Sequence, residues 1–334
     1  MASLARDDPD PGLHSAAFWL LRRWSLDDEL AAVRRSLPRG NAPARPGDRW
    51  FVNAEGQTFT VVPGPVSFVM GEPMWSSDGE RFALPHRVRI ERDFAIATAE
   101  VTAAEFDRFR IDLAARGITI AWKPRTQFVR DPDGPALAVD FYLAARYCNW
   151  LSERAGIPRD QWCFVEKDGT LDLAPDYLQR TGYRLPTEAE WEFACRAGTE
   201  TPWPIGRGWG GQVPFIDQYS WCLTGYSRNQ SRPVGLLKPN DLGLFDMLGN
   251  AHEWCLDPKE DYCRGACHRE LVDREHPERL SREGKRILRG GWFNFPAEGV
   301  SSGHRSWGRA LDDDNEIGLR LARTLPRPAV ASLP

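Results

Sequence analysis

The sequence predicts an α+β fold in which irregular loops carry much of the structure. Strand-like runs begin after residue 57, and two later sites have the Thr-x-x-Glu pattern of a helix start. The 334 residues include 29 glycines, 26 prolines and 14 tryptophans, so we expect many turns held in place by buried indoles. These features favour one large mixed domain preceded by a short helical segment.

The first part of the chain is predicted to contain two short helices. Apolar residues recur at helical spacing from Leu13 to Trp24. Ser25, followed by Asp28, suggests the cap of a second helix that ends before Pro38.

A connector rich in proline and glycine follows at residues 38–48. We therefore divide the chain into a helical lead-in with its connector at 1–48, the main domain at 49–325, and a tail at 326–334.

Strands and helices alternate irregularly in the main domain. Strand patterns are found at 58–62, 66–70, 88–96, 286–289 and 319–322. Three helices are expected, each from its own cap: Thr102 with Glu105, Asp140, and Thr187 with Glu190. Regular patterns fade over roughly ninety residues after Gly198, where loops are expected.

Composition limits the possible partners and location. The net charge is −4, which offers no electrostatic footprint for nucleic acid. The sequence has no apolar run long enough to span a membrane, and its first residues lack the apolar core of a secretory signal. The seven scattered cysteines suit reduced thiols. These features predict a cytoplasmic protein that binds neither nucleic acid nor membrane.

The segment from Gly243 to Trp254 is the most distinctive part of the sequence. It reads GLFDMLGNAHEW, a tight turn that carries two carboxylates between large apolar side chains. Three other motifs accompany it: GYRLPTEAEWE at 182–192, LRGGWF at 288–293 and IGLR at 317–320. Together these motifs resemble the formylglycine-generating enzyme (sulfatase-modifying factor) family, a variant of the C-type lectin fold, over about residues 57–324.

The resemblance implies a structural calcium site at this turn. In the family, the matching positions bind calcium through two side chains and two carbonyls. Asp246 and Glu253 would supply side-chain oxygens here, and Gly249 and Ala251 would supply backbone carbonyls, the hard ligands that calcium prefers. In the alternative interpretation, Glu253 is a buried carboxylate paired with an arginine, and Asp246 caps a turn.

The resemblance also shows what this chain lacks. The family's enzymes oxidise a cysteine of a target protein with copper(I) held by two cysteines, because thiolates are soft ligands. The positions that match those cysteines are Phe295 and Val300, in a loop shorter than that of the enzymes. Conversion of cysteine to formylglycine is therefore not expected.

Other metal chemistry has weaker support. The sulfoxide-synthase relatives hold iron with histidines, but the six histidines here lack the helical pairing of that site. Cys263 and Cys267 have the spacing of a zinc pair without a clear second pair. An oxygen-using oxidase or hydroxylase with copper or iron, held by Cys255, His252 or His304, is the alternative function.

The segment from Trp292 to Glu316 is the candidate ligand-binding region. It combines aromatic, arginine and acidic residues where the family places its ligand-facing loop, and such residues dominate recognition sites. The candidate residues are Phe295, His304, Arg305, Trp307 and Arg309. The leading hypothesis is a non-catalytic module that recognises a protein or a small molecule. Its lead-in resembles those of long bacterial proteins, so it could be the C-terminal sensor of a larger protein.

Overall fold

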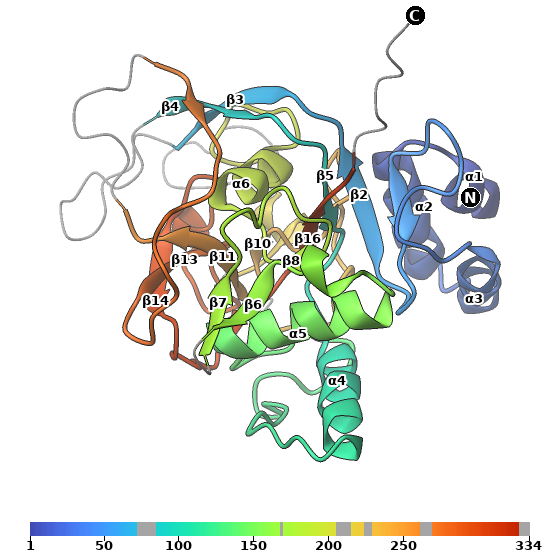
Figure 1. The fold of residues 1–334 in the computed structure, drawn as a ribbon. Helices are drawn as coiled ribbons and strands as arrows, with labels where there is room; N and C mark the ends of the chain where they lie inside the picture. Colours follow the sequence, from blue (N-terminus) through green and yellow to red (C-terminus); the bar gives the residue numbers. More distant parts are fainter. Residues whose placement is uncertain (72–84, 168–169, 205–214, 224–228, 261–268, 327–334) are drawn as a thin grey trace, which may run out of the picture.

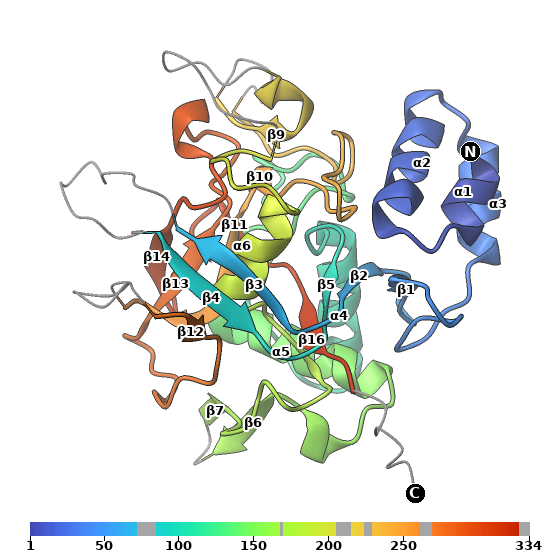
Figure 2. The same ribbon diagram turned by 90° about the horizontal axis from the view of Figure 1, so that it is seen from above.

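The computed structural model describes residues 1–71, 85–167, 170–204, 215–223, 229–260 and 269–326. The main domain forms the body of the molecule, and the N-terminal helices lie beside it (Figure 1). Figure 2 shows the same arrangement from above. The predicted α+β class with N-terminal helices is confirmed.

Three helices form the lead-in, one more than the sequence predicts: α1 (Ala2–Asp7), α2 (Pro11–Arg23) and α3 (Asp27–Ser36). Asp10 caps α2 by accepting a hydrogen bond from the backbone of Leu13 at 3.0 Å. The predicted cap of α3 is wrong, because Leu26 is its N-cap and no side chain caps it. Ser25 has a φ of 55°, so it turns the chain before the helix begins.

The lead-in is attached to the main domain by close packing and hydrogen bonds. Trp19 Nε1 donates to the carbonyl of Leu236 at 3.1 Å, and Arg22 donates to that of Val234 at 2.9 Å. Gly243 has a φ of +77°, and a Cβ there would lie 2.3 Å from the carbonyl oxygen of Pro11. Glycine is therefore required where α2 meets the segment Gly243–Trp254, which we call the signature turn.

Two sheets form the framework of the main domain. The first has the order β1-β2-β5-β16-β8 and is antiparallel throughout. Its strands are β1 (Trp50–Val52), β2 (Thr58–Val62), β5 (Phe94–Ala97), β8 (Tyr183–Arg184) and β16 (Ala322–Thr324). The second has the order β14-β13-β11-β15. Its strands are β11 (His252–Pro258), β13 (Lys285–Arg289), β14 (Ser306–Arg309) and β15 (Ile317–Gly318).

The predicted strand at 319–322 is wrong. The chain leaves the second sheet after β15 and enters the first sheet at β16, so the residues between them connect the two sheets. Arg320, in the middle of this connection, is fully buried. A period-two pattern cannot reveal a crossing between sheets, because buried residues occur on both sides of it.

Smaller sheets and three helices complete the domain. The remaining strands are β3 (Val66–Met70), β4 (His86–Ile90), β6 (Phe164–Lys167), β7 (Thr170–Leu173), β9 (Ser220–Trp221), β10 (Leu248–Gly249) and β12 (Leu271–Val272). The helices are α4 (Ala103–Ala115), α5 (Phe141–Arg154) and α6 (Glu188–Arg196). The three predicted caps are confirmed, and two of them are complete capping boxes. No helix within the described ranges is long and apolar enough to cross a membrane.

Helix α6 is buried although it carries three glutamates, Glu188, Glu190 and Glu192. Each glutamate is paired with at least one arginine of the core. Burial by itself would raise the pKa of Glu190, but the guanidinium groups of Arg184 and Arg92 lower it to about 2. These buried salt bridges connect α6 to the neighbouring parts of the domain that carry the family motifs.

Candidate functional site

The signature turn, Gly243–Trp254, contains β10 and the first residues of β11. Glu253 accepts three hydrogen bonds from Arg320: Nε donates to Oε1 at 3.0 Å and to Oε2 at 2.9 Å, and Nη2 donates to Oε1 at 2.7 Å. Trp191 Nε1 donates to Oε2 at 2.7 Å. All three side chains are fully buried. For Glu253, the structure therefore shows the arginine-paired alternative that the sequence left open.

Asp246 lies in the same turn with a left-handed φ of 54°. Its Oδ2 accepts a hydrogen bond from the backbone of Gly235 at 2.7 Å. Its Oδ1 is buried and has no hydrogen-bond partner among the described residues. Burial raises the pKa of Asp246 to about 6, and the negative charge of Glu253 adds to the effect.

A third carboxylate, Glu100, joins this turn and was not identified from the sequence. Its Oε2 accepts from the side chain of Asn250 at 2.6 Å, and its Oε1 accepts from the backbone of Ala251 at 3.0 Å. Burial raises its pKa well above the ordinary value, as do the charges of Asp246 and Glu253. Because 151 positions separate Glu100 from Ala251, no local pattern predicts the contact.

The predicted calcium ligands fit a cation only in part. Glu253 already has a cation, Arg320, on both of its oxygens, which leaves Asp246 Oδ1 as the side-chain oxygen without a partner. Gly249 and Ala251, the two predicted carbonyl ligands, lie in the same turn and are buried. Within the described ranges, no three His, Cys, Asp or Glu side chains are grouped so that they could hold a metal ion. Calcium at this turn stays a prediction.

The positions that match the family's copper-binding cysteines are filled by hydrocarbon. A Cβ on Gly291 would lie 2.6 Å from Val300 Cγ1 and 3.4 Å from Phe295 Cδ1. Val300 is fully buried. Both side chains therefore pack over the second glycine of the Gly-Gly pair, and neither can ligate a metal.

An aromatic cluster surrounds Phe295. Its ring lies 4.3 Å from that of Trp292 and 4.9 Å from that of His304, measured between centroids. His252 lies 4.8 Å from Trp292. Burial lowers the pKa of His252 to about 3 and that of His304 to about 4, with Arg289 adding to the effect on His304. Both imidazoles are neutral at pH 7, so the cluster carries no charge.

The other three candidate residues lie in different surroundings. Arg305 forms a bidentate salt bridge with Glu188, at 2.7 and 3.0 Å, and is therefore engaged within the fold. Trp307 is 41% exposed on β14, and the ammonium groups of Lys285 and Lys259 lie 3.8 and 4.8 Å from its ring centroid. Arg309 is exposed two residues further along the same strand.

The remaining predicted metal ligands are cysteines. Cys255 is buried in an apolar cluster, and burial raises the pKa of its thiol well above the ordinary value. A neutral buried thiol of this kind is a poor metal ligand. Cys263 and Cys267 lie outside the described residues.

Comparison with known proteins identifies the family. Residues 51–325 match a family described as the sulfatase-modifying factor enzyme 1-like domain. The chain belongs to this family. The fold agrees with the structure of PvdO from Pseudomonas aeruginosa, with a TM-score of 0.62 and 27% identity. The aligned part covers 83% of this chain and 98% of that one.

Two curated members of the sulfatase-modifying factor family show how its functions vary. The formylglycine-generating enzyme of Bos taurus is 30% identical over 267 residues, which are 68% of this chain and 64% of that enzyme. The chaperone protein LppX of Paenibacillus barcinonensis is 40% identical over 144 residues, which are 36% of this chain and 51% of that protein. The matches thus span about half to two thirds of these relatives. Membership of this family establishes the fold of the chain. The particular function depends on the residues of the site.

Proposed function

We propose that the chain is a non-catalytic recognition module of the sulfatase-modifying factor family. The packing of Phe295 and Val300 over Gly291 carries this proposal. It places hydrocarbon where the resemblance to formylglycine-generating enzyme requires two thiolates, and a hydrocarbon cannot bind copper. The loop has therefore lost the groups that perform the family's oxidation while the surrounding motifs are retained.

The recognition surface is the Trp307 patch, formed by Trp307, Arg309, Lys285 and Lys259. Trp307 is the exposed aromatic centre, and the two lysines lie against its ring. β14, which carries Trp307 and Arg309, is at the end of the strand order of its sheet. A terminal strand with an exposed aromatic side chain and positive charges suits an acidic protein segment.

The proposal keeps a structural cation, but with fewer ligands than the sequence predicts. Of the predicted calcium ligands, Asp246 Oδ1 lacks a hydrogen-bond partner within the described part of the chain. Glu100, Asp246 and Glu253 together bring three carboxylates to one guanidinium. A calcium ion at Asp246 and the carbonyls of Gly249 and Ala251 would relieve this excess negative charge, and its role would be structural.

Selection of peptide ligands tests the recognition proposal. A displayed peptide library is selected on the wild-type protein, and the enriched peptides are measured against Trp307→Ala and Trp24→Ala. Trp24 is a matched control because it is 54% exposed on the lead-in. We expect acidic peptides that lose binding with Trp307→Ala and keep it with Trp24→Ala. Peptides that bind both variants equally would contradict the assigned surface.

A separate assay tests the absence of catalysis. The purified protein is incubated with copper(I), oxygen and a cysteine-containing peptide, and the peptide is analysed by mass spectrometry. We expect no aldehyde product and no copper at stoichiometric level. Turnover with copper would overturn the proposal and support the oxygen-using alternative.

A further inference from the structure

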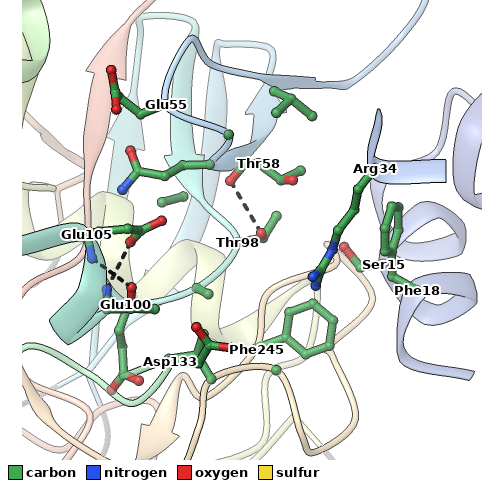
Figure 3. A pocket seen from close by; sticks show the side chains of 18 of the residues that line it. Ser15, Phe18, Arg34, Glu55, Thr58, Thr98, Glu100, Glu105, Asp133 and Phe245 are labelled. Carbon is green, nitrogen blue, oxygen red and sulfur yellow. Dashed lines mark hydrogen bonds between the residues drawn. The ribbon is translucent and has the colours of Figure 1, made fainter. Parts of the chain in front are cut away.

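A cavity of about 570 Å³ lies between the lead-in and the main domain. Helices α2 and α3 form one wall, and β2, β5 and the start of α4 form the other (Figure 3). None of the residues of the Trp307 patch lines it. Its volume falls in the range of sites that enclose small organic molecules.

Aromatic side chains contribute apolar surface to both walls. Phe18 of α2 lines the cavity from the helical side, and Phe245 of the signature turn lines it from the domain side. Phe245 is 8% exposed, so its ring is held in place by the core. The cavity can therefore contact an apolar group between two rings that come from separate parts of the chain.

The arginines of the cavity have no salt-bridge partners among the described residues. Arg22, Arg34, Arg39 and Arg108 line it, and none of them forms a salt bridge with a described residue. Arg22 and Arg39 donate to backbone carbonyls instead. Arg34 has no hydrogen-bond partner within the described ranges, and Figure 3 shows its side chain reaching from the helical side into the cavity. A guanidinium in this position favours an anion that fits its fork of donors.

Five acidic side chains line the same space, and of these only Glu55 forms a salt bridge with a described residue. Glu55 is paired with Arg154 at 2.9 Å, and Glu100 and Glu105 accept hydrogen bonds from amides of the fold. Asp133 lines the cavity from the domain side and Asp27 from the first turn of α3, and no described residue forms a salt bridge with either of them. The negative charge of Asp133 acts on Arg34 across the cavity. The cavity thus presents cationic and anionic side chains, with Arg34 on the helical wall and Asp133 on the domain wall.

We propose that this cavity binds an amphoteric small molecule, a free amino acid or a short peptide. Its carboxylate pairs with Arg34, its ammonium group faces Asp133, and its apolar side chain packs against Phe18 and Phe245. Inorganic phosphate fits less well, since it leaves most of the volume empty and has no group for Asp133. This binding is separate from recognition at the Trp307 patch.

Calorimetry with the full chain tests the proposal. The probes are phenylalanine, N-acetylphenylalanine without the ammonium group, phenylalanine amide without the carboxylate, and inorganic phosphate. Each probe is titrated into the wild type, Arg34→Gln, Asp133→Asn and Arg35→Gln. Arg35 is the matched control, because it is exposed on α3 next to Arg34 and does not line the cavity.

We expect phenylalanine to bind the wild type and Arg35→Gln with the same affinity. Arg34→Gln should weaken phenylalanine binding about tenfold or more, the effect of losing one charge-assisted hydrogen bond. Asp133→Asn should weaken binding of phenylalanine and leave that of N-acetylphenylalanine unchanged. Failure of phenylalanine to bind, equal losses in Arg34→Gln and Arg35→Gln, or preference for phosphate would each overturn the proposal. Loss of binding at the Trp307 patch would leave these results unaffected, so the two proposals can fail separately.

Discussion

Replacing Asp246 by asparagine should stabilise the protein at neutral pH. The two side chains have nearly the same shape, and asparagine tolerates the left-handed φ of 54° at this position. The amide oxygen can still accept the hydrogen bond from Gly235. The substitution therefore removes the negative charge and keeps the turn.

The size of the effect follows from the pKa of Asp246. Burial raises this pKa to about 6, from an ordinary value of 3.8. A carboxyl group whose pKa is raised by folding contributes stability below pH 3.8, and this contribution is lost as the pH rises through 6. At about 1.4 kcal/mol per pH unit of difference, ionisation of Asp246 costs about 3 kcal/mol at pH 7. Asp246→Asn should recover up to this amount in the absence of a bound cation.

Urea unfolding of the wild type and of Asp246→Asn, followed from pH 4 to pH 8, measures the difference directly. Asp241→Asn is the control, because Asp241 is an exposed aspartate of the preceding loop. We expect the advantage of Asp246→Asn to grow between about pH 4 and pH 6 and then to level off. The series is repeated with chelator and with calcium.

Bound calcium should reverse the sign of the stability difference between Asp246→Asn and the wild type. If an ion binds Asp246, calcium should stabilise the wild type, and Asp246→Asn should abolish that response. A destabilised Asp246→Asn variant in chelator, with no pH-dependent difference from the wild type, would refute the reasoning about the buried charge.

Three further predictions concern other parts of the fold. Arg320→Met should destabilise the protein by about 3–5 kcal/mol in urea unfolding, because it leaves Glu253 buried without its cation; a loss below about 1 kcal/mol would contradict this. Gly243→Ala should lower the melting temperature more than Gly117→Ala and should speed proteolysis of the lead-in, since both glycines have a positive φ but only Gly243 is in close contact. Burial lowers the pKa of His14 to about 4, so the wild type loses stability as the pH falls from 6.5 towards 4; His14→Phe should remove up to about 3 kcal/mol of this loss, and an unchanged pH profile would refute the assignment.

The elements predicted from local signals agree best with the structure. The capping boxes at Thr102 and Thr187 are complete, because each depends on hydrogen bonds between residues three positions apart. The strand at 319–322 was misplaced, because the chain changes sheets there. The predicted helix cap at Ser25 is wrong, because Ser25 adopts a left-handed turn that no local pattern in the sequence indicates.

The candidate site was predicted only in its outline. The signature turn and the apolar replacements at Phe295 and Val300 could be read from the sequence. Arg305 could not be assigned, because its salt bridge with Glu188 joins residues 117 positions apart. The pairing of Glu253 with Arg320 likewise spans 67 positions.

By itself, the sequence determined the family, the α+β class, the capped helices and the absence of cysteines at 295 and 300. These features depend on residue identity or on hydrogen bonds within one turn of chain. The tertiary structure alone decided that Arg320 neutralises Glu253, that Glu100 joins the turn, and that Arg34 and Asp133 face one cavity. Such contacts arise where distant segments pack together, and the energies of buried charges depend on which groups that packing places beside them.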